Sequence, residues 1–411
     1  MTDQIKNWLQ QAVEDTIFCW SCRGLDLPLT LRIADQSWTL HLCEKPRFLD
    51  THGGGITLEA PMALWAEVLR VDPAPGLHSF GALIRNERGP AVTGSPIALA
   101  QALAALERLI ELARPAPTPF TGFNFLHDVS NVTSRHRVVA LPDGTFARLH
   151  YMEAGQGWPV VFLHTAGADA RQFLHQLADT KLQKNHRLLA FDMPWHGLSS
   201  GADNVETTAQ YKLTEARYLQ WVVAFIDEIV QEPVILVGCS MGASMALTVA
   251  AQRPDLLRGV VALEAPLTSP GRKSELLTDA RIADSQHNPA YVRAMLGPNC
   301  PQKQRDEACA IYTQARPGVY MGDLGYYSEE YDGKRLAPAL RTCGVPIELL
   351  TGSYDYSASP ANTQQLLNEI GSNTATFHEM DGLGHFPMIE DPDRFRPHFC
   401  AALARIEERR P

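Results

Sequence analysis

Short apolar runs, each closed by a polar or glycine-rich turn, recur through the C-terminal two thirds of this 411-residue chain. Runs of this length with many β-branched residues predict buried strands. They occupy residues 160–163, 187–191, 233–237, 260–263, 346–352 and 375–380. Stretches rich in helix formers, such as 243–251 and 361–370, lie between some of them. Strands that alternate with helices predict an α/β fold around a mostly parallel sheet.

The N-terminal part of the chain has a different pattern, which predicts a small α+β domain over residues 1–114. Its apolar periodicity predicts a helix over 5–17, strands at 29–33 and 38–42, and a long helix over 97–112. Ser95 and Pro96 suit the cap and the first position of that last helix.

A proline-rich stretch at 114–119 follows and predicts a stiff, extended linker. We therefore assign residues 115–135 to a linker and entry segment, and residues 136–411 to the α/β domain.

One serine lies between a predicted strand and a predicted helix, in the sequence Gly238-Cys239-Ser240-Met241-Gly242. Gly-x-Ser-x-Gly in this context is typical of a nucleophile on a sharp turn, because side chains at the glycine positions would collide across the turn. The helix that follows directs free N–H groups at the reacting centre. The alternative is a tight turn whose serine only caps the helix.

A serine nucleophile needs a base, and the base needs an acid that orients it. Asp355 and His385 each follow a predicted strand, so both belong on loops at the carboxyl edge of the sheet, where Ser240 also lies. Glu264 ends the strand at 260–263 and is a rival for the role of Asp355.

Two further segments complete a resemblance to a known family. Residues 160–164 resemble its third strand with a trailing His, and residues 187–199 resemble its Asp-x-Pro-Gly-His-Gly-x-Ser run, with Trp195 in place of the first Gly. With the order serine, aspartate, histidine, these motifs make residues 136–405 similar to α/β-hydrolase-fold enzymes of the esterase and lipase type.

The resemblance implies a role for each residue of the site. Ser240 attacks a carbonyl carbon, His385 accepts its proton, and Asp355 orients the histidine. Water then releases the acyl group, and neither a metal nor an organic cofactor is implied. The expected reaction is hydrolysis of a carboxylic ester or lactone. Cleavage of a C–C bond in a vinylogous diketone and amide hydrolysis remain open, because the same three residues serve all of these reactions.

The N–H groups that would bind the oxyanion are assigned by position. The resemblance places one on Met241 and the other on Ala166, with Thr165 next in line. The second assignment is less direct, because residues 164–167 read His-Thr-Ala-Gly where many relatives have His-Gly.

Between the strand at 260–263 and the strand at 346–352, residues 267–338 lose the strand rhythm and predict a helical lid. Its aromatic and methionine side chains are candidates for a substrate pocket or for the lid's own small core: Tyr291, Met295, Tyr312, Tyr320, Met321, Tyr326 and Tyr327. We assign substrate binding to Thr165, Tyr320 and Tyr326. A lid of this length suits a medium-sized apolar or aromatic compound.

Composition and charge limit the partners. The net charge of −10, without a Lys/Arg cluster, argues against nucleic acid. The sequence has no run of about 18 apolar residues, which argues against a membrane span. Its eight cysteines lack framework spacing and there is no signal-peptide pattern, which favours reduced thiols in a cytoplasm. The expected partner is a small ester-like molecule, and a homo-oligomer is compatible with the sequence.

Residues 56–65 followed by 92–96 resemble the sterol-carrier-protein-2-like fold, whose members bind lipids in an apolar tunnel. This resemblance implies a domain that holds a hydrophobic ligand near the active site. The alternative is a packing module without a cavity. In a third reading, the whole chain is a lipid-binding protein with a vestigial hydrolase domain.

Overall fold

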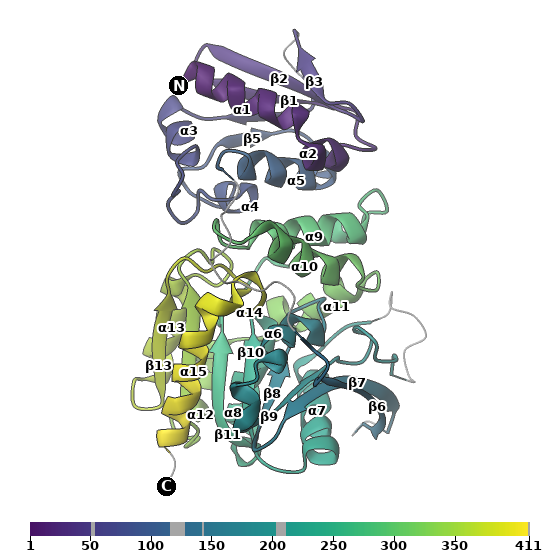
Figure 1. The fold of residues 1–411 in the computed structure, drawn as a ribbon, viewed down its shortest axis with the longest axis vertical. Coiled ribbons are helices and arrows are strands. Elements are labelled where there is room, and N and C mark those ends of the chain that lie inside the picture. The colour runs from purple at the N-terminus through teal and green to yellow at the C-terminus, as the bar shows by residue number, and fades with distance from the viewer. Residues whose placement is uncertain (51–53, 116–127, 142–143, 203–210, 410–411) are drawn as a thin grey trace.

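The computed structural model describes residues 1–411 apart from 51–53, 116–127, 142–143, 203–210 and 410–411. Most of the proline-rich part of the predicted linker lies outside the described residues. Figure 1 shows a small N-terminal unit above a larger unit, with two helices of the larger unit between them. None of the helices in the described ranges combines the length and apolarity that crossing a bilayer requires.

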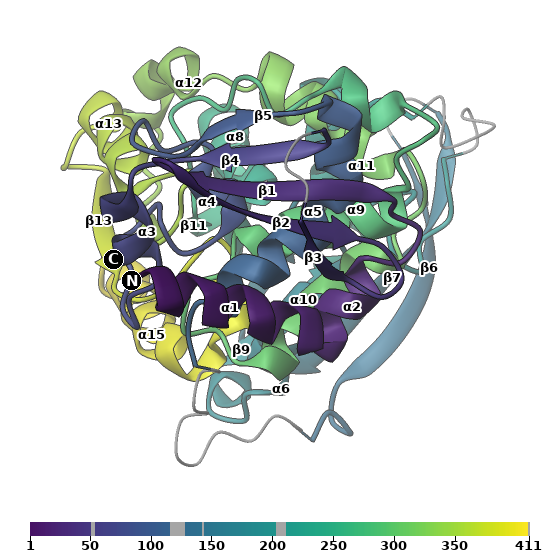
Figure 2. The ribbon, with the colours of Figure 1, turned by 90° about the horizontal axis from the view of Figure 1, so that it is seen from above.

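The N-terminal unit is an α+β unit, as the sequence predicts, and it contains a five-stranded sheet. The strand order is β3-β2-β1-β4-β5. The strands are β1 (Leu27–Ile33), β2 (Gln36–Leu42), β3 (Arg47–Leu49), β4 (Ile56–Glu59) and β5 (Ala91–Thr93). The helices are α1 (Thr2–Glu14), α2 (Thr16–Ser21), α3 (Met62–Val68), α4 (Phe80–Leu83) and α5 (Pro96–Glu111). Figure 2 shows this unit from above, with the sheet next to α1 and α2.

The first predicted helix is in fact two helices that meet at Asp15. This residue has extended backbone angles, and its carboxylate accepts a hydrogen bond from the Phe18 N–H at 2.7 Å, which caps α2. The same carboxylate is held by Arg108 of α5. The apolar periodicity continues through this junction, so periodicity alone does not reveal it.

The larger unit has an eight-stranded sheet in the order β13-β12-β11-β10-β8-β9-β7-β6. Only β7 pairs antiparallel, with β6 and with β9; the other pairs are parallel. The strands are β6 (Thr133–Ala140), β7 (Phe146–Gly155), β8 (Trp158–Leu163), β9 (His186–Phe191), β10 (Val234–Cys239), β11 (Leu257–Leu263), β12 (Ile347–Gly352) and β13 (Ala375–Met380). This confirms the predicted α/β fold and its mostly parallel sheet.

Helices cover both faces of this sheet. Because successive strand residues point to opposite faces, Val161 of β8 joins one apolar core and Val160 and Phe162 join the other. The first core includes α7 (Glu215–Phe225), α8 (Met241–Gln252), α12 (Gly333–Leu340) and α13 (Pro360–Ile370). The second includes α6 (Leu174–Ala178), α14 (Pro387–Glu390) and α15 (Pro392–Glu408). Central strands buried on both faces read as continuous apolar runs, which is why the sequence reveals them.

The predicted lid region is helical. It contains η6 (Glu275–Thr278), α9 (Asp284–Ala294), α10 (Gln302–Thr313), α11 (Val319–Leu324) and the π-helix η7 (Gly325–Glu330). α9 and α10 lie between the two units in Figure 1, and α5 packs against α9. The N-terminal unit therefore rests on the lid, and it also contacts the loop after β12, where the Tyr354 hydroxyl donates to the Pro73 oxygen at 2.9 Å.

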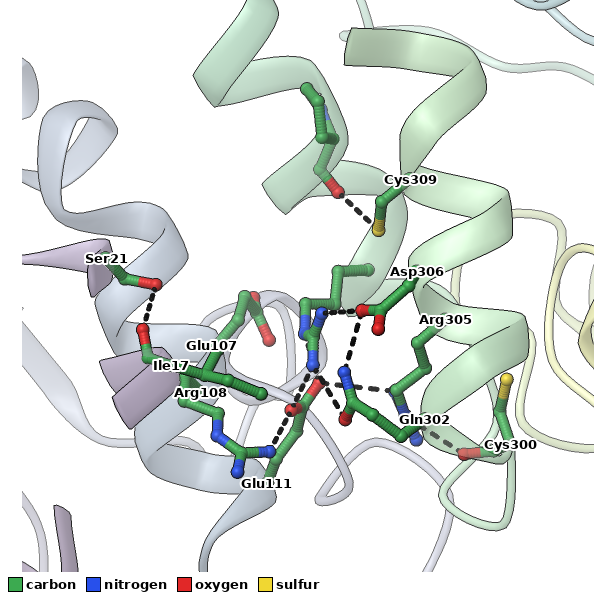
Figure 3. A network of polar contacts seen from close by, with 12 residues as sticks. Ile17, Ser21, Glu107, Arg108, Glu111, Cys300, Gln302, Arg305, Asp306 and Cys309 are labelled. Atoms are coloured by element: carbon green, nitrogen blue, oxygen red, sulfur yellow. Dashed lines mark hydrogen bonds and ion pairs between the residues drawn. The ribbon is translucent and has the colours of Figure 1, made fainter. Parts of the chain in front are cut away.

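A buried charge network joins α5 to the lid (Figure 3). The Glu111 carboxylate, at the end of α5, accepts hydrogen bonds from Arg293 of α9 at 2.6 and 2.7 Å. Arg305 of α10 lies 3.4 Å away, and Arg108 of α5 lies 3.1 Å away. Burial alone raises the pKa of Glu111, but the guanidinium charges outweigh it and lower the pKa to about 2. Glu111 is therefore an ionised partner shared by three cations.

Candidate active site

Ser240 occupies a strained turn between β10 and α8. Its backbone angles are φ 55° and ψ −114°, in the left-handed half of the map that L-residues rarely adopt. A Cβ atom at Gly238 would lie 2.2 Å from the Gly242 carbonyl, and one at Gly242 would lie 2.3 Å from the Leu163 oxygen. The two glycines therefore permit the close approach of strands and helix that the motif predicts.

The Ser240 side chain contacts the lid. Its hydroxyl donates to the Tyr327 hydroxyl at 3.1 Å, and the residue is only 4% exposed. No hydrogen bond joins the Ser240 hydroxyl to His385, although both residues line the same pocket. Such bonds are often long in the absence of substrate and tighten in the complex.

His385 and Asp355 form a buried pair. The His385 Nδ1–H donates to Asp355 Oδ2 at 2.7 Å. The other carboxylate oxygen of Asp355 accepts from the N–H groups of Ser357 and Ala358, at 2.6 and 3.0 Å. Burial acts to raise the pKa of Asp355, but the charge of His385 and these hydrogen bonds lower it to about 2. Asp355 is therefore an ionised acceptor that fixes the ring of His385 with Nε2 free to act.

Hydrogen bonds to the Glu390 side chain fix the loop that carries His385. The Glu390 carboxyl accepts hydrogen bonds from the N–H groups of Gly384 and Gly297, the latter at 2.9 Å. Burial raises the pKa of Glu390 to about 7. The backbone N–H of His385 donates to the backbone oxygen of Met295 at 2.9 Å. The position of the histidine thus depends on the lid segment that follows α9.

Glu264 lies behind Asp355 rather than against the histidine. It ends β11 with φ 53°, and its carboxyl accepts from the Gly352 N–H at 3.0 Å. Burial, and then the negative charge of Asp355, raise the pKa of Glu264 well above its usual range. Of the two candidate acids, only Asp355 makes a hydrogen bond to His385 within the described ranges.

One group of potential metal ligands is found among the described residues: Glu264, Asp355 and His385, whose ligand atoms lie within 4.8 Å of one another. Hydrogen bonds already account for these atoms, since His385 Nδ1 binds Asp355, and Glu264 binds the Gly352 N–H. The raised pKa of Glu264 also disfavours the charged form that a cation would need. The geometry suits a hydrogen-bonded chain of acids better than a metal centre.

The loop after β8 carries the second candidate oxyanion donor. The Thr165 N–H is already engaged by Gln172 Oε1 at 2.9 Å. Within the described ranges, the N–H groups of Ala166 and Met241 meet no acceptor. Of the two candidates in this loop, Ala166 is therefore the one with a free donor.

The lid residue Asp323 holds this loop. Its carboxylate accepts from the Gly167 N–H at 2.7 Å, from His196 Nε2 at 2.9 Å and from the Tyr211 hydroxyl at 2.7 Å. His196 belongs to the run after β9, where Trp195 has φ 75°. Trp195 thus has a left-handed backbone conformation. Glycine adopts this conformation easily, and the motif that this segment resembles has a glycine at this position.

The pocket beside Ser240 is small, about 30 Å³. Thr165 and Tyr320, to which we assign substrate binding from the sequence, line it. Four more of the lid side chains named as candidates line it as well: Tyr291, Met295, Tyr312 and Tyr327. Tyr326 does not line it. Its hydroxyl lies 3.3 Å from Thr248 Oγ1, and its ring packs against Tyr218 in the core.

Other pocket residues were not foreseen from the sequence: Arg272, Val292, Leu324, Ser357 and Phe386. Arg272 is the one with charge. The sequence offers only a weak signal for it, a basic residue within a lid that otherwise attracts attention through its tyrosines.

Comparison with known proteins agrees with this geometry. The model of the alpha/beta hydrolase family matches residues 160–397. The chain therefore belongs to the alpha/beta hydrolase family, and it is a hydrolase.

The curated relatives include two named hydrolases of succinate derivatives. The (E)-2-((N-methylformamido)methylene)succinate hydrolase of Acinetobacter baylyi is 31% identical over 238 residues, which is 55% of this chain and 83% of the relative. The 2-(acetamidomethylene)succinate hydrolase of Mesorhizobium japonicum is 30% identical over 247 residues, 56% of this chain and 84% of the relative. Among solved structures, a thermophilic esterase from Thermogutta terrifontis superimposes with a TM-score of 0.57 at 18% identity, over 66% of this chain and 99% of that one.

Proposed function

We propose that this protein is a serine hydrolase that cleaves a carboxylic ester or lactone through an acyl-enzyme. The observation that carries the proposal is the arrangement around Ser240. The serine lies on a left-handed turn, and the His385–Asp355 pair lines the same pocket. Within the part of the chain that the structure describes, no acceptor meets the N–H groups of Met241, at the start of α8, and Ala166, on the loop after β8.

The steps follow from these positions. Ser240 Oγ leaves its hydrogen bond to Tyr327, gives its proton to His385 Nε2 and attacks the carbonyl carbon. The N–H groups of Met241 and Ala166 stabilise the oxyanion, at about 3–4 kcal/mol for each donor. His385 then protonates the leaving oxygen, the C–O bond breaks, and the same residue activates a water that releases the acid. Asp355 stabilises the imidazolium throughout.

Amide hydrolysis is the second candidate. Two of the curated relatives, 31% and 30% identical, are hydrolases of compounds whose names contain a formamido or acetamido group, that is, an amide. The same proton transfers apply, with a leaving nitrogen in place of oxygen.

Rapid-mixing kinetics with 4-nitrophenyl esters test the proposal. An acyl-enzyme predicts a burst of one nitrophenolate per Ser240, followed by slower turnover, and no burst in Ser240→Ala. Parallel assays of lactones, N-acyl enamines and vinylogous diketones then rank the bond types. Undiminished ester turnover by Ser240→Ala would refute the nucleophile assignment, and turnover of only the enamines would favour the amide reaction.

A further inference from the structure

A second, larger cavity lies between the N-terminal unit and the lid. Its volume is about 460 Å³, against about 30 Å³ for the pocket beside Ser240. α4, α5 and the segment after α4 form one side, and α9 with the segment around η6 forms the other. Three side chains line both spaces: Arg272, Tyr291 and Tyr320. The two spaces thus share a wall.

The small pocket has room only for the reacting group. A water molecule needs about 10–15 Å³ of such a cavity, so about 30 Å³ holds only two or three waters. A substrate larger than that must extend past the shared wall, and the neighbouring space large enough to receive it is the cavity between the units.

Two cations meet at this junction. Arg272 donates to the Tyr291 hydroxyl at 3.3 Å and to the Ser357 oxygen. Arg85, which follows α4, donates to the same hydroxyl at 2.9 Å. Within the described ranges, no carboxylate forms an ion pair with either guanidinium. Two guanidiniums that converge without an acid form a site for an anion.

Glu107 also lines the cavity but does not neutralise these charges. Its carboxyl accepts hydrogen bonds from the N–H groups of Phe80 and Gly81, at 2.9 and 2.7 Å. Burial raises its pKa to about 8, so the group is largely neutral at pH 7. The cavity therefore keeps its positive character.

The rest of the lining is mostly apolar, with contributions from both units: Ile84, Val92, Leu99, Leu103, Leu276 and Leu277. Ile84 is 46% exposed, so part of this apolar lining is accessible from the solvent.

We propose that this cavity binds the body of the substrate, and that the substrate is an amphipathic acid derivative. Its reacting carbonyl lies at Ser240, its negatively charged group lies between Arg272 and Arg85, and its apolar portion lies along α5. The N-terminal unit is thereby part of the substrate site. This inference rests on the proposed function, which it deepens by naming the substrate class.

A matched pair of esters tests the proposal. 4-Nitrophenyl hydrogen 3-phenylglutarate carries a carboxylate and a phenyl group, and its methyl ester has nearly the same shape without the charge. The wild-type protein should prefer the acid, as a ratio of the two kcat/KM values. The variant Arg85→Gln should lower this ratio about tenfold, as expected for the loss of one charge-assisted hydrogen bond. Rates with Ser240→Ala give the uncatalysed background.

Arg88→Gln is the matched control, because Arg88 is exposed in the same segment and does not line the cavity. Its ratio should equal the wild-type ratio. Arg85 is exposed as well, so its replacement should leave the fold intact. A ratio that is the same in Arg85→Gln and wild type would overturn the proposal, and so would an equal fall in Arg88→Gln.

A binding measurement separates this inference from the proposed function. Calorimetry of Ser240→Ala should show tighter binding of monomethyl 3-phenylglutarate than of the dimethyl ester, and the added Arg85→Gln change should remove the difference. If the wild-type protein cleaves neither ester but this difference is present, the anion site stands and the proposed reaction is wrong. Equal binding of the two compounds would overturn the anion site.

Discussion

At the residue scale, Asp355 binds His385 and Glu264 lies behind Asp355, and the pKa values of the two carboxyls shift in opposite directions. The pKa of Asp355 falls to about 2, despite its burial, under the charge of His385 and hydrogen bonds that include one to Glu264. The pKa of Glu264 rises through burial and through the charge of Asp355. Glu264 is therefore the carboxyl of the pair that keeps its proton to higher pH, and Asp355 faces the histidine as an anion.

Replacing each acid by its amide separates their roles. Asp355→Asn should lower kcat on the order of 10³–10⁴-fold, because the amide favours the wrong histidine tautomer. Glu264→Gln should lower it less than about tenfold, since the glutamine still donates to Asp355 and accepts from the Gly352 N–H. Steady-state kinetics, with thermal unfolding of each variant as the control, measures both. The reverse order of effects would make Glu264 the orienting acid.

The candidate site was predictable where the motif and the chain order determine it. Ser240, Asp355 and His385 each follow a strand, and the carboxyl edge of a parallel sheet brings such loops together. Arg85 and Arg272 could not be assigned to the site in this way. The two side chains come close to each other only because the two units pack together, and no local sequence pattern predicts that packing.

At the element scale, the turn between β10 and α8 requires glycine at Gly238. Gly238→Ala should destabilise the fold by about 3 kcal/mol or more, since the new Cβ meets backbone atoms at 2.2 Å that cannot move aside. Gly24→Ala is the control: it has φ +76° with nothing within 4 Å, and it should cost only about 1–2 kcal/mol. Denaturant midpoints measure both. Equal losses would show that the neighbouring backbone relaxes around the new Cβ and that the collision does not set the need for glycine at Gly238.

Asp323 of α11 couples the lid to the oxyanion loop. Asp323→Asn keeps the size of the side chain but exchanges one acceptor oxygen for a donor. At the Oδ2 position this donor opposes both the N–H of Gly167 and the proton of His196, and at the Oδ1 position it meets the Tyr211 hydroxyl. We expect kcat to fall about 10–100-fold with little change in KM, because the displaced loop carries the Ala166 N–H that acts in the transition state. A change confined to KM would instead assign Asp323 to substrate binding.

The register of the lid could not be predicted, and Tyr326 shows why. η7 is a π-helix, in which about one extra residue per turn shifts the side chains that follow. Tyr327 consequently reaches Ser240, and Tyr326 points to the core beside Tyr218. A list of lid tyrosines is available from the sequence, but their orientation depends on this local winding.

At the scale of the whole molecule, the Glu111 network fastens the N-terminal unit to the lid (Figure 3). Both units have their own apolar cores and were predictable as α+β and α/β. The packing of the two units through α5 and α9 could not be predicted, because charged residues at a helix end usually lie on a solvated surface. The likeness of residues 1–114 to the sterol-carrier-protein-2-like fold remains a prediction.

Glu111→Gln should destabilise the protein at pH 7 by about 3–5 kcal/mol, because three guanidiniums lose a buried counter-charge. The ordinary pKa of the group is 4.5 and the folded value is about 2, so its contribution is complete above pH 4.5 and is lost as the pH falls toward 2. The difference between wild type and variant should shrink over that range. Glu59→Gln, which breaks an exposed pair with Arg32, should change stability by less than about 1 kcal/mol. A pH-independent difference would contradict an ionised Glu111.

Intact-mass analysis after exposure to a fluorophosphonate tests the central claim, an activated Ser240, most directly. Such reagents react with a serine whose neighbours activate its hydroxyl. The account predicts one adduct on the wild-type protein and none on Ser240→Ala. An adduct that persists in Ser240→Ala, or a folded wild-type protein that hydrolyses esters without forming one, would contradict it.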